Sequence, residues 1–199
     1  MWSAAILGGG QARRFAGQDK SALIVDGRSI VERQMAELFQ VTTDVMIVGS
    51  HRIPRAPGVV RLVPDGVPGC GPLGGLHAAL TAAEGEATIV VACDMPYLSA
   101  PFVNHLLALT READVVVPRT DRGYHPLCAA YTRACLAPVT RRLADGRLKM
   151  ADLFEDVKVR VVTAREIDAF GDHHRLLANV NTPAEYRCLV ALQGHQLES

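Results

Sequence analysis

Ala4-Ala5-Ile6-Leu7-Gly8-Gly9-Gly10, near the start of the chain, is an apolar run that ends in three glycines. Three further apolar runs of strand length follow it, at 44–48, 87–92 and 113–117. Such nearly uninterrupted apolar runs predict strands that are covered on both faces. Between the runs, residues 29–39 and 76–83 carry apolar side chains at helical spacing. Ile30, Val31, Met35 and Leu38 form one face of the first predicted helix.

The alternation of strands and helices determines the fold class that we expect. Strand, helix and strand in repetition predict right-handed crossovers around a mostly parallel sheet, with helices on both faces. A chain of 199 residues is long enough for one good-sized core. We therefore expect a single α/β domain over residues 1–199, built as three αβα layers. Ligands of such sheets bind at the carboxyl ends of the strands.

Composition argues against several classes of partner. The 21 basic and 21 acidic residues cancel, so no broad positive field is expected for nucleic acid or for an anionic membrane. No apolar run reaches the roughly 20 residues that a membrane span needs, and the apolar start lacks the features of a signal peptide. The five cysteines are irregularly spaced, which is typical of reduced thiols. These features predict a cytoplasmic protein.

The first predicted strand is followed by a glycine-rich loop with a basic flank. Successive glycines let the backbone turn sharply and expose N–H groups to a phosphate chain. Arg13, Arg14 and Lys20 could neutralise phosphate oxygens that the amides do not reach. The loop is neither a dinucleotide fingerprint nor a Walker A motif, because Arg13 and Asp19 stand where those motifs need glycine. A plain glycine-rich turn remains the alternative.

An aspartate ends the third predicted strand, in Cys93-Asp94-Met95-Pro96. A carboxylate at the tip of a buried strand is costly without a partner and suits Mg²⁺ held against phosphates. Asp94 is therefore the leading candidate for a metal ligand. The alternative is a helix cap or turn former before Pro96.

Four segments of the chain are informative together: residues 7–20, with the pattern L-x-G-G-x-x-x-R-[FM]-x-G-x-D-K; Pro64-Asp65 with 71–76; 93–96, with the pattern C-D-x-P; and 179–183, with the pattern N-x-N-T-P. Together they resemble the molybdenum cofactor guanylyltransferases of the nucleotidyltransferase superfamily. In that family the second segment binds guanine, the third binds magnesium and the fourth lies near the acceptor. The first and third segments are shared with cytidylyl- and uridylyltransferases. The resemblance implies a Rossmann-like fold of the nucleoside-diphospho-sugar transferase type.

The resemblance also implies roles for individual residues. About 1–110 would bind the nucleotide and about 111–199 the acceptor. Catalysis would rest on Lys20, Arg14 and Asp94, with Asp94 as the Mg²⁺ ligand. The residues implied in nucleotide binding are Leu7, Gly8, Gly9, Lys20, Asp65, Gly74 and Asp94, and those implied in acceptor binding are Asn179 and Asn181. His51 departs from the family, which often has an asparagine at that point.

The reaction implied is transfer of GMP from GTP to molybdopterin, which yields molybdopterin guanine dinucleotide and pyrophosphate. GTP and molybdopterin would be the small-molecule partners, with transient contact to other cofactor-biosynthesis proteins or target apoenzymes. Guanine needs an acceptor, and either Asp65 or backbone carbonyls in 69–75 could supply it. A related cytidylyltransferase, another transferase that joins a nucleotide to a phosphorylated acceptor, and an inactive nucleotide-binding regulator are the alternatives.

The second half of the sequence allows two interpretations at several positions. His125 could help to form the acceptor pocket or could be a satisfied histidine at the entrance of a strand. Asn179 and Asn181 could contact the acceptor, while Asn181-Thr182-Pro183 also reads as a helix N-cap. A pterin phosphate could use a basic group of residues that otherwise reads as a solvated helix face: Arg141, Arg142, Arg147 and Lys149.

Overall fold

The computed structural model describes residues 1–8, 23–25, 27–49, 55–67, 69–180 and 185–186. The strands within these residues are β1 (Trp2–Leu7), β2 (Ile24–Val25), β3 (Arg28–Ser29), β4 (Asp44–Val48), β5 (Val60–Val63), β6 (Ala87–Ala92), β7 (Val115–Thr120), β8 (Gly123–Tyr124), β9 (Cys128–Thr132) and β10 (Val159–Thr163). The helices are α1 (Ile30–Leu38), α2 (Gly71–Ala82), α3 (Ala100–Ala108), α4 (Leu136–Ala144), α5 (Ala164–Ile167) and α6 (His173–Leu176), with 3₁₀ turns η3 (Leu109–Arg111), η4 (Arg133–Cys135) and η5 (Met150–Glu155).

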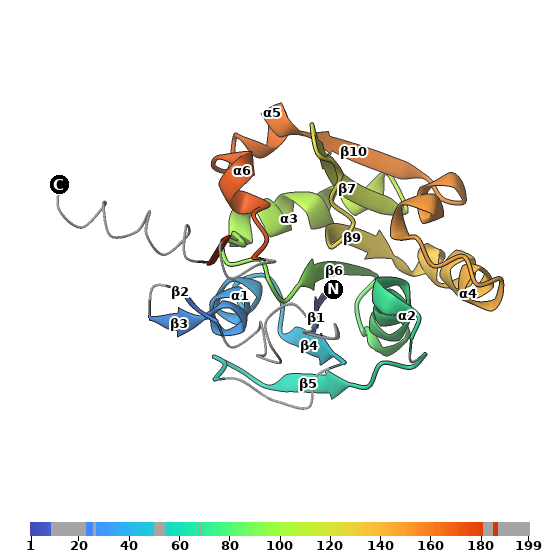
Figure 1. Ribbon diagram of the computed structural model, residues 1–199, viewed down its shortest axis with the longest axis horizontal. Coiled ribbons are helices and arrows are strands. Elements are labelled where there is room, and N and C mark those ends of the chain that lie inside the picture. Colours follow the sequence, from blue (N-terminus) through green and yellow to red (C-terminus); the bar gives the residue numbers. More distant parts are fainter. Residues whose placement is uncertain (9–22, 26, 50–54, 68, 181–184, 187–199) are drawn as a thin grey trace.

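One sheet organises the molecule (Figure 1). Its strand order is β10-β7-β9-β6-β1-β4-β5, with β8 paired to β7 and a separate β2–β3 hairpin. β1 pairs in parallel with both β4 and β6, and the pairs β4–β5 and β7–β10 are also parallel. β9 runs antiparallel to its neighbours β6 and β7, as β8 does to β7. The expected mostly parallel sheet is confirmed.

Helices cover both faces of the sheet, as the alternation of strands and helices predicts. Along β1, Ala4 and Ile6 face a core shared with α1 and α3, whereas Ala5 and Leu7 face a core shared with α2 and α4. Figure 1 shows α1 and α2 on opposite sides of β1 and β4. Because successive strand residues point to opposite faces, a strand buried on both sides must be apolar throughout, which explains the uninterrupted runs. The three αβα layers are confirmed.

The first predicted helix is confirmed almost to the residue. Ser29 caps α1 and exchanges hydrogen bonds with Glu32 in a capping box, so the helix starts directly after the serine. The second helix starts earlier than predicted, at Gly71 rather than near Leu76. Glycine and proline at 71–75 suggested a loop, but Pro72 lies in the first turn of α2, where its missing N–H costs nothing.

The second half of the sheet departs further from the prediction. β7 begins two residues later than the apolar run and continues through Pro118 to Thr120. The prediction also lacked the two edge strands β5 and β10. Most of their residues are only partly buried, so their sequences lack the continuous apolar run of the central strands. No helix among the described residues is long and apolar enough to cross a membrane.

Candidate nucleotide site

The predicted site depends on two strand tips being neighbours, and they are. Leu7, the last residue of β1, pairs with Ala92, the last residue of β6. The Cys93 N–H then donates to the Leu7 carbonyl at 3.3 Å, and the Gly8 N–H donates to the Val48 carbonyl at 2.8 Å. The start of the glycine loop therefore lies between the tips of β4 and β6. Residues 9–22 and 50–54, which include Gly9, Arg14, Lys20 and His51, lie outside the described residues.

Asp94 stands in the turn between β6 and α3, at the carboxyl edge of the sheet. One of its carboxylate oxygens is shielded from solvent. Its backbone carbonyl accepts a hydrogen bond from the Val180 N–H at 2.9 Å. This bond brings the segment that carries Asn179 against the turn that carries Asp94, although the two are far apart in the sequence. Asn181, the second predicted acceptor residue, lies outside the described residues.

Asp65 and Gly74 also meet at this edge. Asp65 follows β5, and its Oδ1 atom is shielded from solvent with no hydrogen-bond partner among the described residues. A Cβ atom on Gly74 would stand 3.3 Å from that oxygen, and one on Gly75 would stand 3.2 Å from the Leu7 side chain. The two glycines therefore let the start of α2 approach both Asp65 and the tip of β1. Cys70, the N-cap of α2, makes no side-chain cap hydrogen bond.

A set of polar side chains on α1 contacts the turn that carries Asp94, and these residues were not predicted from the sequence. Gln34 is fully buried and its Nε2 atom donates to the carbonyls of Ala92 and Met95 at 2.7 and 2.9 Å. Arg33 donates to the Pro96 carbonyl at 3.2 Å, and the Ala100 N–H donates to Glu37 at 2.8 Å. A signal was present: Gln34 lies three residues after Val31 and four before Leu38, on the predicted apolar face.

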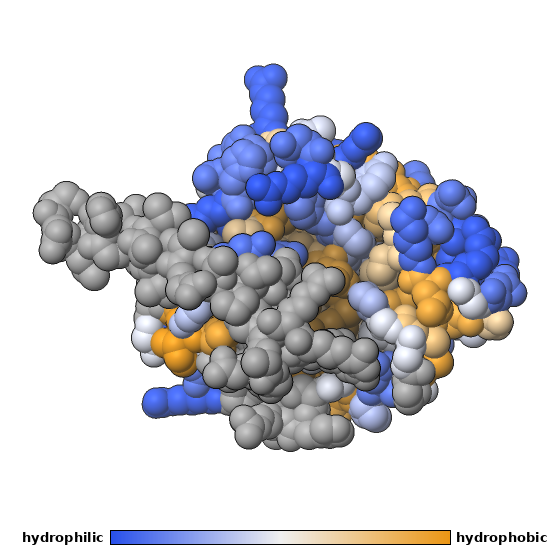
Figure 2. Space-filling view, viewed as in Figure 1, coloured by the Kyte–Doolittle hydropathy of each residue, from blue (hydrophilic) through white to orange (hydrophobic). Residues whose placement is uncertain are grey.

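A cationic and aromatic pair lies beside the turn that carries Asp94. The Arg175 guanidinium lies 4.5 Å from the ring centroid of Tyr97, which follows the Asp94 turn. Arg33 approaches the same ring at 5.8 Å. Figure 2 shows apolar surface in the centre of the view, with hydrophilic surface over α5 and α6 and a mixture of apolar and hydrophilic surface over α4.

His125 is a satisfied histidine at the entrance of β9. Its Nε2 atom lies 2.9 Å from the Thr120 hydroxyl, and its backbone N–H donates to the Pro118 carbonyl. Burial, followed by the positive charge of Arg122, lowers the pKa of His125, which favours the neutral ring. The segment that follows His125 contacts the tip of β6, because the Ala92 N–H donates to the Leu127 carbonyl at 2.9 Å.

The basic residues around α4 differ in their exposure to solvent. Arg142 is only 1% exposed and pairs with Asp156 at 2.5 Å and Glu155 at 3.4 Å. The interpretation of Arg142 as part of a solvated face is wrong, because its guanidinium holds η5 against α4. Its pairing with two carboxylates also leaves it poorly placed for a pterin phosphate. Arg141, Arg147 and Lys149 are exposed.

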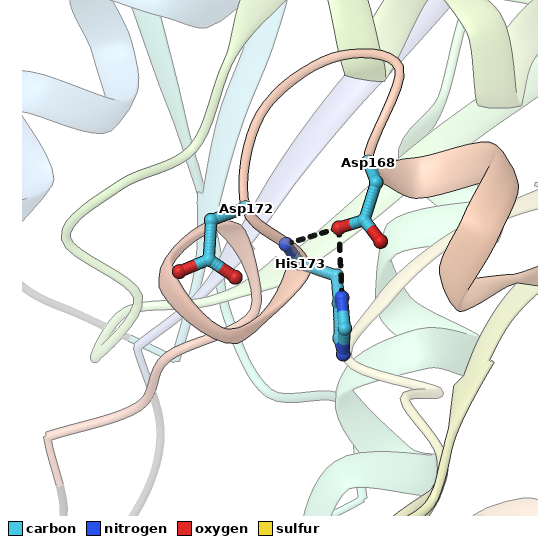
Figure 3. A group of neighbouring side chains, drawn as sticks. All are labelled: Asp168, Asp172 and His173. Carbon is cyan, nitrogen blue, oxygen red and sulfur yellow. Dashed lines mark hydrogen bonds and ion pairs between the residues drawn. The ribbon is translucent and has the colours of Figure 1, made fainter.

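A cluster of two carboxylates and one imidazole lies beside α6 (Figure 3). One ligand atom from each of Asp168, Asp172 and His173 lies within 4.8 Å of the others. Asp168 accepts hydrogen bonds from the backbone N–H and the Nδ1 atom of His173, at 3.0 and 2.8 Å, and Asp172 accepts from the His174 N–H. The side-chain bond from His173, followed by the backbone bond, lowers the pKa of Asp168. The Asp172 bond caps α6, and the Asp168 bonds tie the end of α5 to the start of α6.

A parallel sheet with a glycine turn after a central strand, and an aspartate at the tip of the next strand, is the layout of a nucleotide-binding αβα protein. A family model for the MobA-like NTP transferase domain matches residues 4–161. The chain belongs to this family of nucleotidyltransferases.

Relatives and solved structures agree with this assignment. A probable molybdenum cofactor guanylyltransferase of Pelotomaculum thermopropionicum is 34% identical over 180 residues, which cover 90% of this chain and 87% of that protein. The molybdenum cofactor guanylyltransferase of Desulfosudis oleivorans is 32% identical, with 90% of both chains covered. The structure of molybdopterin-guanine dinucleotide biosynthesis protein A from Archaeoglobus fulgidus has a TM-score of 0.81 at 22% identity, and covers 98% of this chain and 100% of that one. At this identity it supports the fold.

Proposed function

We propose that this protein transfers GMP from GTP to molybdopterin, and forms molybdopterin guanine dinucleotide and pyrophosphate. Residues up to about 110 bind the nucleotide and the later residues bind the acceptor. The names of the relatives, molybdenum cofactor guanylyltransferases at 32–34% identity, support the choice of substrates. We further propose that the protein acts in the cytoplasm, with transient contact to proteins that deliver or receive the cofactor.

One observation carries the proposal: three separate parts of the chain converge on one edge of the sheet. The glycine loop leaves β1 beside the Asp94 turn, as the 3.3 Å bond from Cys93 to Leu7 indicates. The Val180 N–H donates to the Asp94 carbonyl in the same turn. A nucleotide held by the loop and an acceptor held near Asn179 would therefore meet at Asp94. This convergence supports a two-substrate transfer better than simple nucleotide storage.

Asp65 is our choice for the guanine contact. Guanine presents its N1–H and exocyclic amine side by side, and a carboxylate can accept from both. The alternative acceptors are the carbonyls of 69–75. Those of 71–75 lie in α2, where carbonyls accept hydrogen bonds from the next turn of the helix, and that of Cys70 accepts from the Gly74 N–H. Asp65 Oδ1 is shielded from water and retains an acceptor position that no described residue uses. A buried acceptor of this kind is costly unless a ligand completes it.

Asp94 fits a magnesium ion by its chemistry. Mg²⁺ prefers oxygen ligands and is commonly bound by one or two carboxylates together with substrate phosphates. The carboxylate of Asp94 supplies such an oxygen, partly shielded from water, at the edge where the phosphates would lie. When bound, the ion would neutralise charge on the phosphates.

The chain itself acts by positioning and by charge. A terminal phosphate of the acceptor is already ionised at neutral pH and needs no general base. Its oxygen attacks the α-phosphorus of GTP, the new P–O bond forms in line, and the bond to the β-phosphate breaks to release pyrophosphate. Backbone amides that begin at Gly8, with Lys20 and Arg14, hold the triphosphate and stabilise the charge that develops.

Pyrophosphate release with purified molybdopterin tests the function, with GTP, CTP, UTP and ATP compared in Mg²⁺. We expect release that requires the acceptor and is fastest with GTP. GTP should also raise the melting temperature most, since preferential binding to the native state increases apparent stability. Equal or faster release with CTP would replace the guanylyl assignment with a cytidylyl one. Nucleotide binding without release would indicate a regulator.

The Asp65→Asn variant tests the guanine contact. An amide offers one acceptor and one donor, so it cannot accept both guanine hydrogen bonds. We expect GTP to bind about tenfold to a hundredfold more weakly, a cost of about 1.4–2.7 kcal/mol, with little change in CTP binding. Asp145→Asn removes an exposed carboxylate at the end of α4 and serves as the matched control. An unchanged preference for GTP over CTP in Asp65→Asn would contradict the assignment.

A further inference from the structure

Gln34 is the polar exception on an otherwise apolar helix face. The buried residues of α1 are Ile30, Val31, Gln34, Met35 and Leu38, and Gln34 is fully buried among them. A buried amide is costly unless it is hydrogen-bonded, and leucine or methionine would fill the same space without that cost. The packing of α1 therefore does not explain a glutamine at this position, and its hydrogen bonds must.

Both hydrogen bonds of Gln34 go to the turn that carries Asp94. Nε2 donates to the Ala92 carbonyl at 2.7 Å and to the Met95 carbonyl at 2.9 Å, so one amide group spans the turn on both sides of Asp94. The orientation of the amide is determined, because the reverse orientation would place Oε1 against two carbonyl oxygens. Among the common side chains, an amide is the neutral group that offers two donors from one atom.

The helix that supplies this brace is itself anchored. Ser29 and Glu32 form a capping box at its start, and the Ile30 N–H donates to the Leu23 carbonyl at 3.0 Å. Arg33 and Glu37 add contacts to Pro96 and Ala100 further along the same segment. The turn between β6 and α3 is thus tied to α1 at several points, and the bonds of Gln34, to Ala92 and Met95, lie on either side of Asp94.

We propose that Gln34 is a positioning residue that orients the Asp94 carboxylate for the divalent cation. It acts by fixing the peptide planes on either side of Asp94. This inference rests on the proposed function, because it assigns Asp94 the role given there. It also makes a separate structural claim: among the contacts that tie this turn to α1, the two hydrogen bonds of Gln34 fix the peptides on either side of Asp94.

The test compares two full-length variants with the wild type. Gln34→Met keeps the length and bulk of the side chain but removes both donors. Leu38→Ala creates a cavity on the same face of α1, in a side chain that is fully buried in the apolar core. Both variants should lower the melting temperature. Only Gln34→Met should alter the metal site, so Leu38→Ala controls for general destabilisation.

The readouts are Mn²⁺ binding in the presence of GTP, measured by calorimetry, and steady-state kinetics. We expect Gln34→Met to bind Mn²⁺ about tenfold to a hundredfold more weakly, as is typical when a residue that orients a metal ligand is lost. kcat should fall by a similar factor while the KM for GTP changes less than threefold. Leu38→Ala should keep wild-type Mn²⁺ affinity. Wild-type Mn²⁺ affinity and kcat in a folded Gln34→Met variant would overturn the inference.

A second variant and a second measurement cover the remaining outcomes. If Gln34→Met does not fold, Gln34→Asn keeps an amide but shortens its reach, and the same loss of Mn²⁺ affinity is expected. If neither variant folds, Gln34 is a general core residue and the inference fails. If the wild type shows no metal-dependent GTP binding, the proposed function fails. Hydrogen exchange then tests the positioning role, because amides of 92–97 should exchange faster in Gln34→Met and not in Leu38→Ala.

Discussion

Carboxylates at the two edges of the central sheet differ in their hydrogen-bond partners. At the amino edge, Asp44 accepts hydrogen bonds from the Ser3 hydroxyl at 2.5 Å and the Glu84 N–H at 3.0 Å, and it also pairs with Arg61. At the carboxyl edge, Asp65 keeps a shielded oxygen without a partner among the described residues.

This difference distinguishes a structural carboxylate from one that is available to a ligand. The amino edge satisfies its charges within the chain, so its polar residues contribute to stability. The carboxyl edge has Asp65, Asp94 and the start of the glycine loop at neighbouring strand tips, where ligands of parallel sheets bind. Substitutions at the carboxyl edge should therefore reduce activity, whereas substitutions at the amino edge should reduce stability.

The largest effect is expected for Asp94→Ala. Removal of the proposed metal ligand should lower kcat by about 10³-fold, with less than a tenfold change in GTP affinity, because the ion acts where charge develops. Pyrophosphate release and GTP calorimetry measure the two quantities. Asp44→Asn is the control at the amino edge: it should reduce the free energy of unfolding while the folded fraction keeps its kcat. Near-normal turnover in Asp94→Ala would remove the metal assignment.

Two glycines give a second comparison of the edges. At the amino edge, a Cβ on Gly85 would lie 2.6 Å from the Trp2 carbonyl carbon and 2.7 Å from the Ser3 nitrogen, which are backbone atoms that cannot move aside. Gly85→Ala should therefore reduce the free energy of unfolding by about 3 kcal/mol, measured by urea denaturation. The folded protein should bind GTP normally.

Gly75→Ala is the matched variant at the carboxyl edge. Its Cβ would press on the Leu7 side chain at 3.2 Å, and that side chain can shift by a few tenths of an ångström. Better helix propensity offsets the strain, so the free energy of unfolding should change by less than about 1 kcal/mol. GTP affinity should fall by roughly threefold to tenfold, about 1 kcal/mol, because Leu7 lies against the proposed nucleotide site. Equal losses of stability in both variants would contradict the comparison.

Much of the sheet could be predicted from the sequence, because strands buried on both faces must be apolar throughout. The apolar runs at β1, β4 and β6 have this pattern, and the predicted helix began at Ser29, the residue that caps α1. The edge strands β5 and β10 were missed, since half-buried residues give no continuous run. The antiparallel direction of β9 was also missed, because direction depends on tertiary pairing and leaves no trace in the apolar pattern.

The candidate site could be predicted in part. The tips of β1 and β6 had to share an edge if the strands were parallel neighbours, and Asp94 could be placed there from its sequence position alone. Gly74 and Asp65 came from the family resemblance, and their contact depends on how α2 packs. The burial of Gln34 and Arg142 was not predicted, for one reason. A polar residue on a helix is expected to face solvent unless its hydrogen-bond partners are known. Here those partners are carbonyls and carboxylates that other segments of the chain supply.

The smallest predicted effect concerns pH at the amino edge. Burial of Asp44 raises its pKa, but hydrogen bonds from Ser3, the Glu84 N–H and Arg61 outweigh burial, so the pKa of Asp44 is lowered from its ordinary value of 3.8. A carboxylate with a lowered pKa contributes stability that is fully present above its unfolded pKa and is lost as the pH falls through its folded pKa.

Urea denaturation of the wild type and Asp44→Asn between pH 6 and pH 2 measures this contribution. The wild type should have the larger free energy of unfolding at pH 6, and its advantage should shrink below pH 4, by roughly 1.4 kcal/mol for each unit by which folding lowers the pKa. An advantage that grows as the pH falls would mean that burial outweighs the hydrogen bonds. Asp44 would then be a strained carboxylate, and the contrast between the two edges would lose its physical basis.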